Sequence, residues 1–151
     1  MEFEKVFLKI AETLEKQGKP VEPCSWWEIR KIKKMAGGKL PEVYLLFLET
    51  MGKRGGDFMK GSDAFYGQLD KLKEDAVEIL REQNFTELPE KSFVFWMHQG
   101  YQFAFFKLDE GDDPPVYFYL EGQKENDFTT KESLSGFYLK QLEFLQFHNK
   151  K

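Results

Sequence analysis

The feature that most constrains the fold is a pair of aromatic-rich runs, FVFWMH at residues 93–98 and YQFAFFKL at 101–108. Gln99-Gly100 lies between them and has the length of a two-residue turn, which predicts an antiparallel β-hairpin. In that register one face carries Val94, Trp96, His98, Tyr101, Phe103 and Phe105, and the other carries Phe93, Phe95, Met97, Ala104 and Phe106. Both faces are apolar, so the hairpin is expected to lie centrally in a sheet covered on most of both sides.

Helical spacing dominates the chain before this hairpin. Ser25 and Glu28 form a capping box that opens one helix, and Pro41 suits the first position of the next, where its missing N–H has no partner to lose. Glycines at 37–38 and 52 end these two helices. Four helices are expected before the hairpin, over residues 3–17, 25–36, 41–51 and 69–84. The glycine-rich stretch 52–67 is expected to be an irregular loop.

Strand signals follow Pro89. A third strand is expected over 116–120, VYFYL, which Pro114-Pro115 precede and begin. Thr129 with Glu132 forms a second capping box that opens a last helix. Helices followed by strands and a final helix predict an α+β domain with a mostly antiparallel sheet and flanking helices. Residues 1–151 are expected to form a single domain, with 1–20 as an N-terminal helix and 25–148 as the core.

Charge and cysteine content limit the classes of function. The 22 basic and 26 acidic residues give a net charge of −4, which argues against direct nucleic-acid binding through phosphate neutralisation. A single cysteine, Cys24, cannot form an internal disulfide and suits a reducing compartment. The first residues lack the apolar core of a signal peptide, and no run reaches the length of a membrane span. A cytoplasmic protein with no membrane partner is therefore expected.

No motif predicts catalysis, a cofactor or a metal ion. Residues 52–57, GKRGGD, lack the spacing of a phosphate-binding loop and follow a helix, so we interpret them as a helix stop and a turn. His98 and His148 have no Cys, Ser or second His at a spacing typical of a nucleophile pair or a metal site. Cys24 precedes a helix N-terminus, where its pKa could fall, but a small residue before the cap is the simpler interpretation.

Acidic and basic residues are segregated along the chain. Seven acids against Lys124 give residues 109–127 a charge of −6, and five bases against Glu28 give residues 28–39 a charge of +4. An EF-hand calcium loop needs flanking helices, which Pro114-Pro115 oppose. Two carboxylates of residues 109–113 could act as acid and base only if the pKa of one were raised, and nothing in this solvated turn is expected to raise it. Two interpretations stay open: the separation steers a protein partner, or it marks solvated faces.

Three segments together resemble one known family. GGKLPEVYLLFLETMG is similar to that family's Leu-Pro-x-x-Tyr-x-x-Phe-Leu helix, with the matching positions Leu40, Pro41, Tyr44, Phe47 and Leu48. The aromatic hairpin with its acidic loop and PPVYFYLEG is the second segment, and TTKESLSGFYLKQLEFL is the third. The chain thus resembles the SUKH superfamily, which includes fungal cell-wall-assembly regulators and many bacterial immunity proteins. Met51-Gly52 departs from the Asn-Gly that is common in the family.

The resemblance implies an α+β domain and, for bacterial members, an immunity protein that neutralises a cognate toxin domain of a polymorphic toxin system, often a nuclease. Inhibition would come from occlusion of the toxin's active site. A nuclease groove is basic, so acids and neighbouring tyrosines are the predicted contacts. They are Asp109, Glu110, Asp112, Asp113, Tyr117, Tyr119, Glu121 and Glu125. For both tyrosines, packing of the sheet under a helix is an alternative.

A second functional hypothesis is a regulatory or scaffold module that binds an endogenous protein, as the eukaryotic relatives suggest. An enzyme ranks third because no nucleophile–base pair, metal-ligand set or cofactor loop supports one. The family's motif residues are interpreted as a core stripe and carry no catalytic role.

Overall fold

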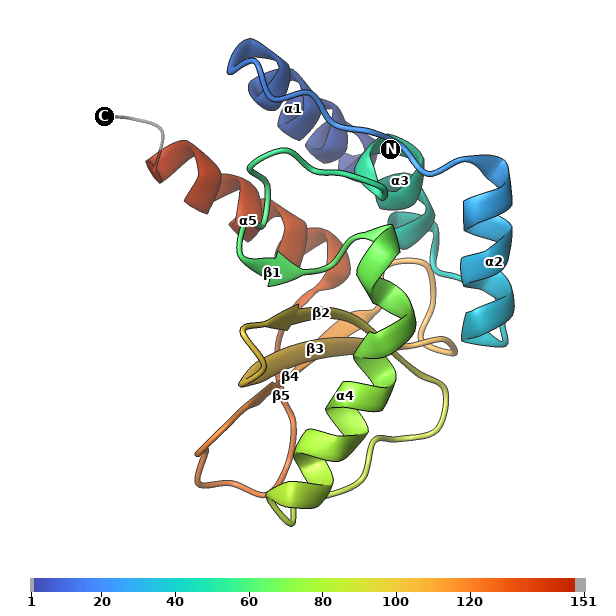
Figure 1. Ribbon diagram of the computed structural model, residues 1–151, viewed down its shortest axis with the longest axis vertical. Coiled ribbons are helices and arrows are strands. Elements are labelled where there is room, and N and C mark those ends of the chain that lie inside the picture. The colour runs from blue at the N-terminus through green and yellow to red at the C-terminus, as the bar shows by residue number, and fades with distance from the viewer. Residues whose placement is uncertain (1, 149–151) are drawn as a thin grey trace.

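Helices cover both faces of one antiparallel sheet in a computed structural model, which describes residues 2–148 (Figure 1). Its helices are α1 (Glu2–Lys16), α2 (Trp26–Ala36), α3 (Glu42–Met51), α4 (Leu69–Glu82) and α5 (Leu134–His148), with a short 3-10 helix at Tyr66–Gln68. Its strands are β1 (Ser62–Asp63), β2 (Ser92–His98), β3 (Gln102–Lys107), β4 (Pro115–Leu120) and β5 (Thr129–Ser133). They pair in sequence order, each pair antiparallel. The predicted α+β class with flanking helices is confirmed.

The central hairpin has a different turn from the predicted one. His98 pairs with Gln102, so three residues and not two connect the strands, and Gln99 and Gly100 both have positive φ. A β-bulge between Val94 and Trp96 absorbs the extra residue. Val94 therefore pairs with Phe105 as predicted, whereas beyond the bulge the predicted pairing is displaced by one residue.

The bulge exchanges side chains between the two faces. Trp96 pairs with Ala104, not with Phe103, and directly paired residues share a face. Trp96 and His98 therefore join the face that packs on α3 and α5, and Met97 joins the face of Phe103. The prediction of the two faces was wrong for these three residues, but both faces are apolar and buried, as expected.

Two strands were missed by the sequence prediction. Residues Thr129–Ser133 form β5, with Thr130 opposite Tyr117, and the last helix begins only at Leu134. The helix start predicted at Thr129 was wrong. The free edge of β4 can pair with a further strand, and β-branched threonines favour the strand conformation. The expected loop at 52–67 contains β1, which pairs Ser62 with His98.

Aromatic rings join the layers of the core. Tyr44 of α3 contacts Phe93 and Phe106 of the sheet, with ring centroids 5.3 Å apart in each case. Phe47 stacks on Tyr138 of α5 at 4.8 Å. The expected core stripe is confirmed, since Leu40, Tyr44, Phe47 and Leu48 are at most 1% exposed. α4 crosses the opposite face of the sheet, in front of it in Figure 1.

The glycine-rich segment after α3 is a helix stop, as predicted. The Gly52 N–H donates to the Leu48 carbonyl at 3.2 Å. A Cβ on Gly52 would lie 2.6 Å from the Leu48 Cα and 2.8 Å from the Cys24 Sγ. Close approach of backbone to backbone, and not phosphate binding, therefore explains the glycine at this position.

Candidate partner-binding site

The eight predicted contact residues do not form one patch. Asp109, Glu110, Asp112 and Asp113 lie in the connection from β3 to β4, whereas Glu121 and Glu125 lie in the connection from β4 to β5. The two connections are at opposite ends of β4, whose six residues span about 20 Å. Each group must be considered separately.

Asp112 and Asp113 cap two helices. The Asp112 Oδ1 accepts from the Glu42 N–H at 3.3 Å, and its carbonyl accepts from the Val43 N–H at 3.1 Å, both at the start of α3. The Asp113 carboxylate accepts from the Ser135 N–H at 2.8 Å and from the Ser135 Oγ–H at 2.6 Å, at the start of α5. These carboxylates satisfy helix N–H groups that lack partners within the helix and lie at its positive end.

Glu110 and Asp109 also have partners within the protein. The Tyr117 hydroxyl donates to Glu110 Oε1 at 2.9 Å, and partial burial together with this carboxylate raises the pKa of Tyr117. The Tyr117 ring stacks on Phe105 with a centroid separation of 5.2 Å. Asp109 forms a long ion pair of 3.9 Å with Lys91. Asp109 is exposed and remains accessible to a partner.

Tyr119 is buried, with 2% of its surface exposed. Its ring stacks on Phe103 at 5.3 Å and meets the edge of Phe85, just after α4, at 4.9 Å. Burial raises its pKa, with a smaller contribution from the charge of Glu121. Packing within the sheet, the alternative for this residue, accounts for the position of the Tyr119 ring.

Glu121 and Glu125 are exposed. Neither carboxylate takes part in a hydrogen bond or ion pair within residues 2–148 as described. An amide holds this connection in shape: Gln123 Oε1 accepts from the Leu120 N–H at 3.0 Å, and its Nε2 donates to the carbonyls of Glu125 and Asp127 at 2.8 and 2.7 Å. The two acids are therefore available to a partner.

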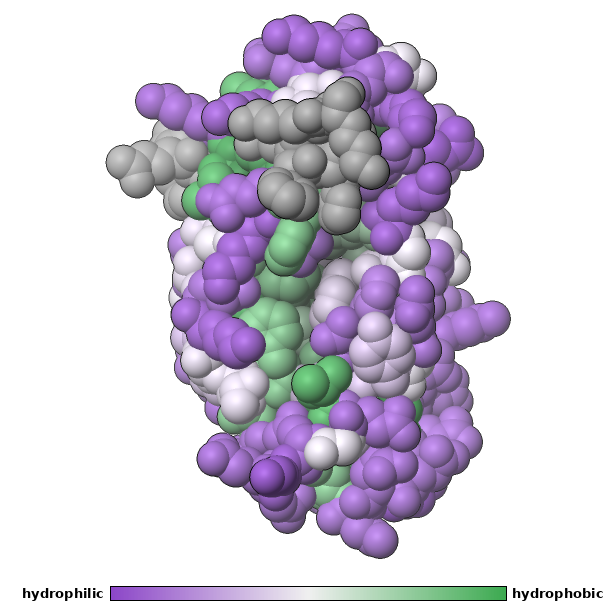
Figure 2. Space-filling view, turned by 90° about the vertical axis from the view of Figure 1, so that its left-hand side faces the viewer, coloured by the Kyte–Doolittle hydropathy of each residue, from purple (hydrophilic) through white to green (hydrophobic). Residues whose placement is uncertain are grey.

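A broad groove of about 1110 Å³ lies beside these acids. Figure 2 shows this side of the molecule, with apolar residues along a furrow between polar margins. Its walls come from the segment before β1, the sheet, the β4–β5 connection and α5. The apolar lining is Met59, Trp96, Phe118, Tyr119, Leu120, Phe137, Phe144 and Leu145, and the polar lining includes Asp57, Lys60, Ser62, His98, Lys124, Glu125, Lys131, Glu132 and Lys140.

The charges around the groove are mixed. Glu132 pairs with Lys140 at 3.0 Å, and Asp57 lies within ion-pair distance of Lys60. Asp57 also pairs with Lys19, and this hydrogen bond lowers the pKa of Asp57. Lys131 has no ion pair among the residues that the structure describes. A partner would therefore meet an apolar floor bordered by both signs of charge.

Sequence reasoning missed the groove. Its floor is built by Phe118, Phe137 and Trp96, which come from three elements and lie together only after folding. Phe144 was the available signal, because it falls off the buried stripe of the last helix and is 58% exposed. Such a side chain marks a contact surface only where other exposed apolar residues adjoin it, and those neighbours come from elements distant in the sequence.

A family model described as SMI1-KNR4 cell-wall, SUKH_6, matches residues 27–137. The match runs from the first turn of α2 to the first turn of α5 and covers more than half of the chain. The chain belongs to the SUKH family. The resemblance inferred from the Leu-Pro helix, the hairpin and the last helix is thereby confirmed. No curated protein matches this chain.

The SUKH protein brings His98 close to a serine that sequence spacing did not reveal. The His98 Nδ1 lies 2.9 Å from the Ser62 Oγ, 36 residues away, because β1 pairs with the end of β2. The imidazole also stacks on Trp96 at 6.0 Å. No carboxylate bonds to this ring within the described residues, so the pair lacks the third group that orients a catalytic base. The contact joins two strands at the edge of the groove.

The remaining features of the SUKH protein that were considered for chemistry are Cys24, His148 and clusters of metal-binding side chains. Cys24 is buried, and burial raises the pKa of its thiol to about 12, which agrees with the interpretation of a small residue before the cap and not with a lowered pKa at a helix start. The side chain of His148 lies outside the described residues. No cluster of three or more metal-binding side chains occurs in the part of the chain that the structure describes. Among the same residues, no helix is long and apolar enough to cross a membrane.

Proposed function

We propose that this SUKH protein is a bacterial immunity protein of the cytoplasm, which binds the toxic domain of a polymorphic toxin and covers its active site. The groove beside α5 carries the proposal. It joins a large apolar floor to exposed charges on a rigid sheet, and such a surface suits a protein partner. In this role the protein acts by binding and excludes the toxin's substrate without chemistry of its own.

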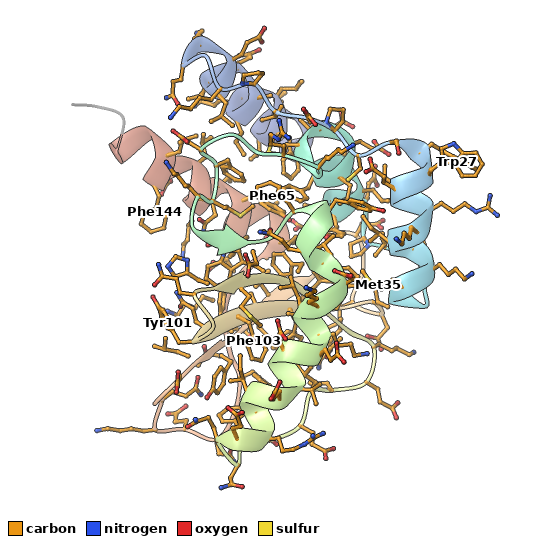
Figure 3. All side chains as sticks on the ribbon, in the orientation of Figure 1. Trp27, Met35, Phe65, Tyr101, Phe103 and Phe144 are labelled. Atoms are coloured by element: carbon orange, nitrogen blue, oxygen red, sulfur yellow. The ribbon has the colours of Figure 1, made fainter. Side chains whose placement is uncertain are left out.

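Two apolar side chains at the groove are suited to anchor a partner. Phe144 is 58% exposed and Leu120 is 49% exposed, and Figure 3 shows Phe144 projecting from α5 away from the body. Side chains of this kind contribute most of the binding energy when a partner encloses them. Their neighbours in the groove would exclude water around the contact.

The acids of the β4–β5 connection favour a partner with a basic surface. Glu125 lines the groove, and Glu121 lies in the same connection; both residues are exposed and their carboxylates are uncommitted. If the toxin is a nuclease, its substrate groove is basic, and these acids would face it. The proposed interface is therefore centred on Glu121 and Glu125. Asp109, Glu110 and Tyr117 lie at the far end of β4, and the carboxylates of Asp112 and Asp113 are occupied by helix caps.

The first experiment expresses the toxic domain encoded beside this gene in bacteria, with and without the SUKH protein. Restored growth together with a co-purifying complex is the expected result. Absence of both, with the SUKH protein folded and well expressed, would contradict the proposal. Restored growth without a complex would also contradict it, because occlusion requires direct binding.

A matched pair of variants then tests the groove. Phe144→Ala removes an exposed anchor of the groove, and Leu8→Ala removes an equally exposed apolar side chain from α1, at 58% and 60% respectively. The expected result is a loss of affinity of at least about tenfold for Phe144→Ala only. Equal affinities of the two variants would show that the toxin binds elsewhere.

The family description supports a second candidate, a regulatory or scaffold module that binds an endogenous protein. The family model that matches residues 27–137 is described as SMI1-KNR4 cell-wall. This candidate predicts a stable complex with a host protein and no protection from a toxin. Affinity purification of the tagged protein, compared with the Phe144→Ala variant, distinguishes it from immunity, because only groove-dependent host partners would support it.

A further inference from the structure

α2 presents a cationic and aromatic face to solvent. Trp27, Arg30, Lys31 and Lys34 follow each other at i, i+3, i+4 and i+7 and so share one side of the helix. All four are exposed, and Trp27 is 72% exposed. Figure 3 shows Trp27 pointing away from the body of the protein. The opposite side of the helix is the one that packs on the core.

A second indole widens this face. Trp26 is 62% exposed, and its ring meets the edge of the Trp27 ring with centroids 4.7 Å apart. The Arg30 guanidinium lies 5.4 Å from the Trp26 ring centroid. Two neighbouring tryptophans left in water are unusual on a monomer surface and mark a contact region. The side chains of these two residues and of Arg30, Lys31 and Lys34 are called the α2 face below.

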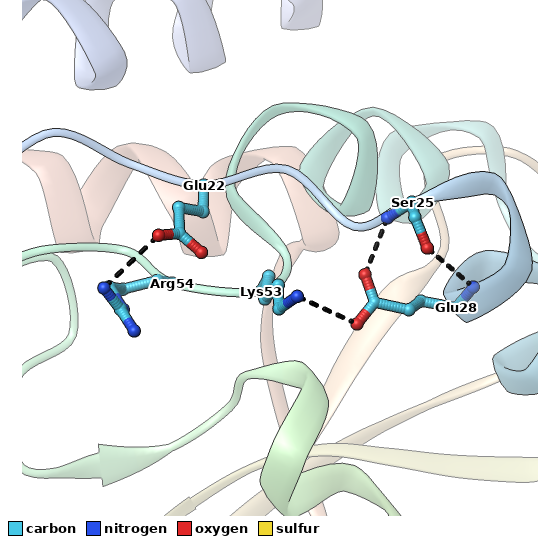
Figure 4. A network of polar contacts seen from close by, with 5 residues as sticks. All are labelled: Glu22, Ser25, Glu28, Lys53 and Arg54. Carbon is cyan, nitrogen blue, oxygen red and sulfur yellow. Dashed lines mark hydrogen bonds and ion pairs between the residues drawn. The ribbon is translucent and has the colours of Figure 1, made fainter.

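The rest of α2 holds this face in a fixed position. Ile32 is buried, and Ile29 and Ala36 pack against the core. At the N-terminus, Ser25 and Glu28 form the predicted capping box, and Glu28 also pairs with Lys53 at 3.5 Å (Figure 4). In Figure 1 the helix stands at the edge of the molecule as a ridge.

Nearby acids have partners elsewhere in the protein. The β3–β4 connection approaches the end of α2, since a Cβ on Gly38 would lie 3.4 Å from Leu108 Cδ1. In that connection Asp112 and Asp113 cap α3 and α5, and Glu110 accepts from Tyr117. The bases of the α2 face have no such partners: none of Arg30, Lys31 and Lys34 forms an ion pair within residues 2–148 as described.

We propose that the α2 face docks the protein reversibly on an anionic lipid surface. Tryptophan favours the boundary between water and hydrocarbon, and lysine and arginine are attracted to anionic headgroups. The prediction of no membrane partner considered a signal peptide and spanning segments. Contact through a short exposed ridge needs neither a spanning segment nor an amphipathic first helix.

Three observations favour a lipid surface over a protein or a nucleic acid. The cations of the α2 face are two lysines and one arginine, and lysine is depleted from the buried centres of protein interfaces. The ridge has 11 residues and is about 16 Å long, which is small for a specific protein interface. It is convex, whereas proteins that bind single-stranded nucleic acid use a basic groove.

The test mixes the intact protein with phosphatidylcholine vesicles that contain no or 40% phosphatidylglycerol. Flotation measures binding, and tryptophan emission reports burial of the indoles. Binding to the anionic vesicles alone is expected, with a blue shift and a loss at high salt. Arg30→Gln, Lys31→Gln and Lys34→Gln combined should weaken binding about 100-fold, at roughly fivefold per base. Trp27→Ala should reduce the blue shift, and Trp26→Ala combined with Trp27→Ala should abolish most of it.

A matched control removes three exposed lysines from α1. Lys5→Gln, Lys9→Gln and Lys16→Gln change the net charge equally and should leave vesicle binding within about twofold. All of these variants change exposed side chains, and circular dichroism checks their fold. No binding to anionic vesicles would overturn the proposal, as would equal losses in the two triple variants. Tighter binding to a single-stranded oligonucleotide than to the vesicles would overturn it in favour of nucleic acid.

Discussion

The two acidic connections at the ends of β4 have similar compositions and different structural roles. In the β3–β4 connection, Asp112 and Asp113 direct their carboxylates inward to the N-termini of α3 and α5. In the β4–β5 connection, Glu121 and Glu125 face solvent, and the amide of Gln123 makes the hydrogen bonds that fix the chain. Acid content alone therefore did not indicate which connection a partner could use.

The difference follows from the part of the structure that lies beside each connection. The β3–β4 connection lies beside two helix N-termini, where unpaired N–H groups attract carboxylates. The β4–β5 connection lies beside the open groove, and its only carboxylate bond to backbone in the described residues is local, from Phe128 N–H to Asp127. An acid with a structural partner stabilises the fold, and an acid without one is free to act in recognition.

Loss of the α5 cap is expected to have the largest effect. Asp113→Ala removes two short hydrogen bonds to Ser135 and should lower the free energy of unfolding by about 2 kcal/mol. Urea denaturation measures it, with Asp109→Ala as the control because Asp109 makes only a long surface ion pair. Equal stability of the two variants would show that the hydrogen bonds from Ser135 to Asp113 do not stabilise the start of α5.

Loss of the α3 cap should cost less. Asp112→Ala removes one longer bond of 3.3 Å to the Glu42 N–H, while the backbone carbonyl of residue 112 can still accept from Val43. The expected decrease in the free energy of unfolding is about 1 kcal/mol. An Asp112→Asn variant should recover part of it, because the amide oxygen also accepts. A full loss in Asp112→Asn would mean that charge, and not the hydrogen bond, is responsible.

These caps show where prediction from sequence stops. The change from helical to alternating spacing placed the helices, the hairpin and the Leu-Pro stripe, since these depend on neighbours within a few residues. The partner of Asp112 is 70 residues away and that of Asp113 is 22 away. No pattern in the local sequence predicts pairs that are so far apart. Likewise, Thr129 and Glu132 matched a capping box, yet pairing with β4 made them a strand.

The prediction of the hairpin turn was wrong for a related reason. A two-residue turn at Gln99-Gly100 fitted the local residues, but the structure uses three residues and a bulge at the level of Phe95. The two changes cancel for Val94 and Phe105, and they move Trp96 to the face that lines the groove. The groove depended on this local irregularity, which is why its floor could not be inferred from alternation alone.

In the β4–β5 connection, Gln123 makes the hydrogen bonds that correspond to those of Asp112 and Asp113 in the β3–β4 connection. Gln123→Ala removes three hydrogen bonds and should lower the free energy of unfolding by about 1 kcal/mol because the site is on the surface. Hydrogen exchange should show faster exchange at the Leu120 N–H and little change in α3 or α5. Loosening that spreads to those helices would contradict the view that the two connections act separately.

Glu28 extends the comparison to an acid that caps its own helix. The hydrogen bond from the Ser25 backbone N–H is the main cause that lowers the Glu28 pKa below 4.5, and Lys53 adds to it. Because the folded pKa is the lower one, the ionised carboxylate stabilises α2 fully above about pH 4.5, and this contribution is lost as pH falls through the folded pKa. Glu28→Gln should therefore lower stability by less than about 1 kcal/mol at pH 7. The difference from the unmodified protein should shrink as the pH falls below about 4.5 and vanish once the pH is below the folded pKa.

The smallest effect on stability is expected for the two uncommitted acids. Glu121→Gln combined with Glu125→Gln should change the free energy of unfolding by less than about 0.5 kcal/mol, since neither carboxylate has a hydrogen bond within the described residues. Under the proposed immunity function, the same variant should slow association with a basic toxin several-fold at low salt and much less at 0.5 M salt, as rim charges do. Asp109→Asn removes an equally exposed acid at the other end of β4, and stopped-flow measurement should find its association rate unchanged. A slower rate for Asp109→Asn, with none for the double variant, would transfer recognition to the β3–β4 connection. Stability and recognition would then be functions of the same connection.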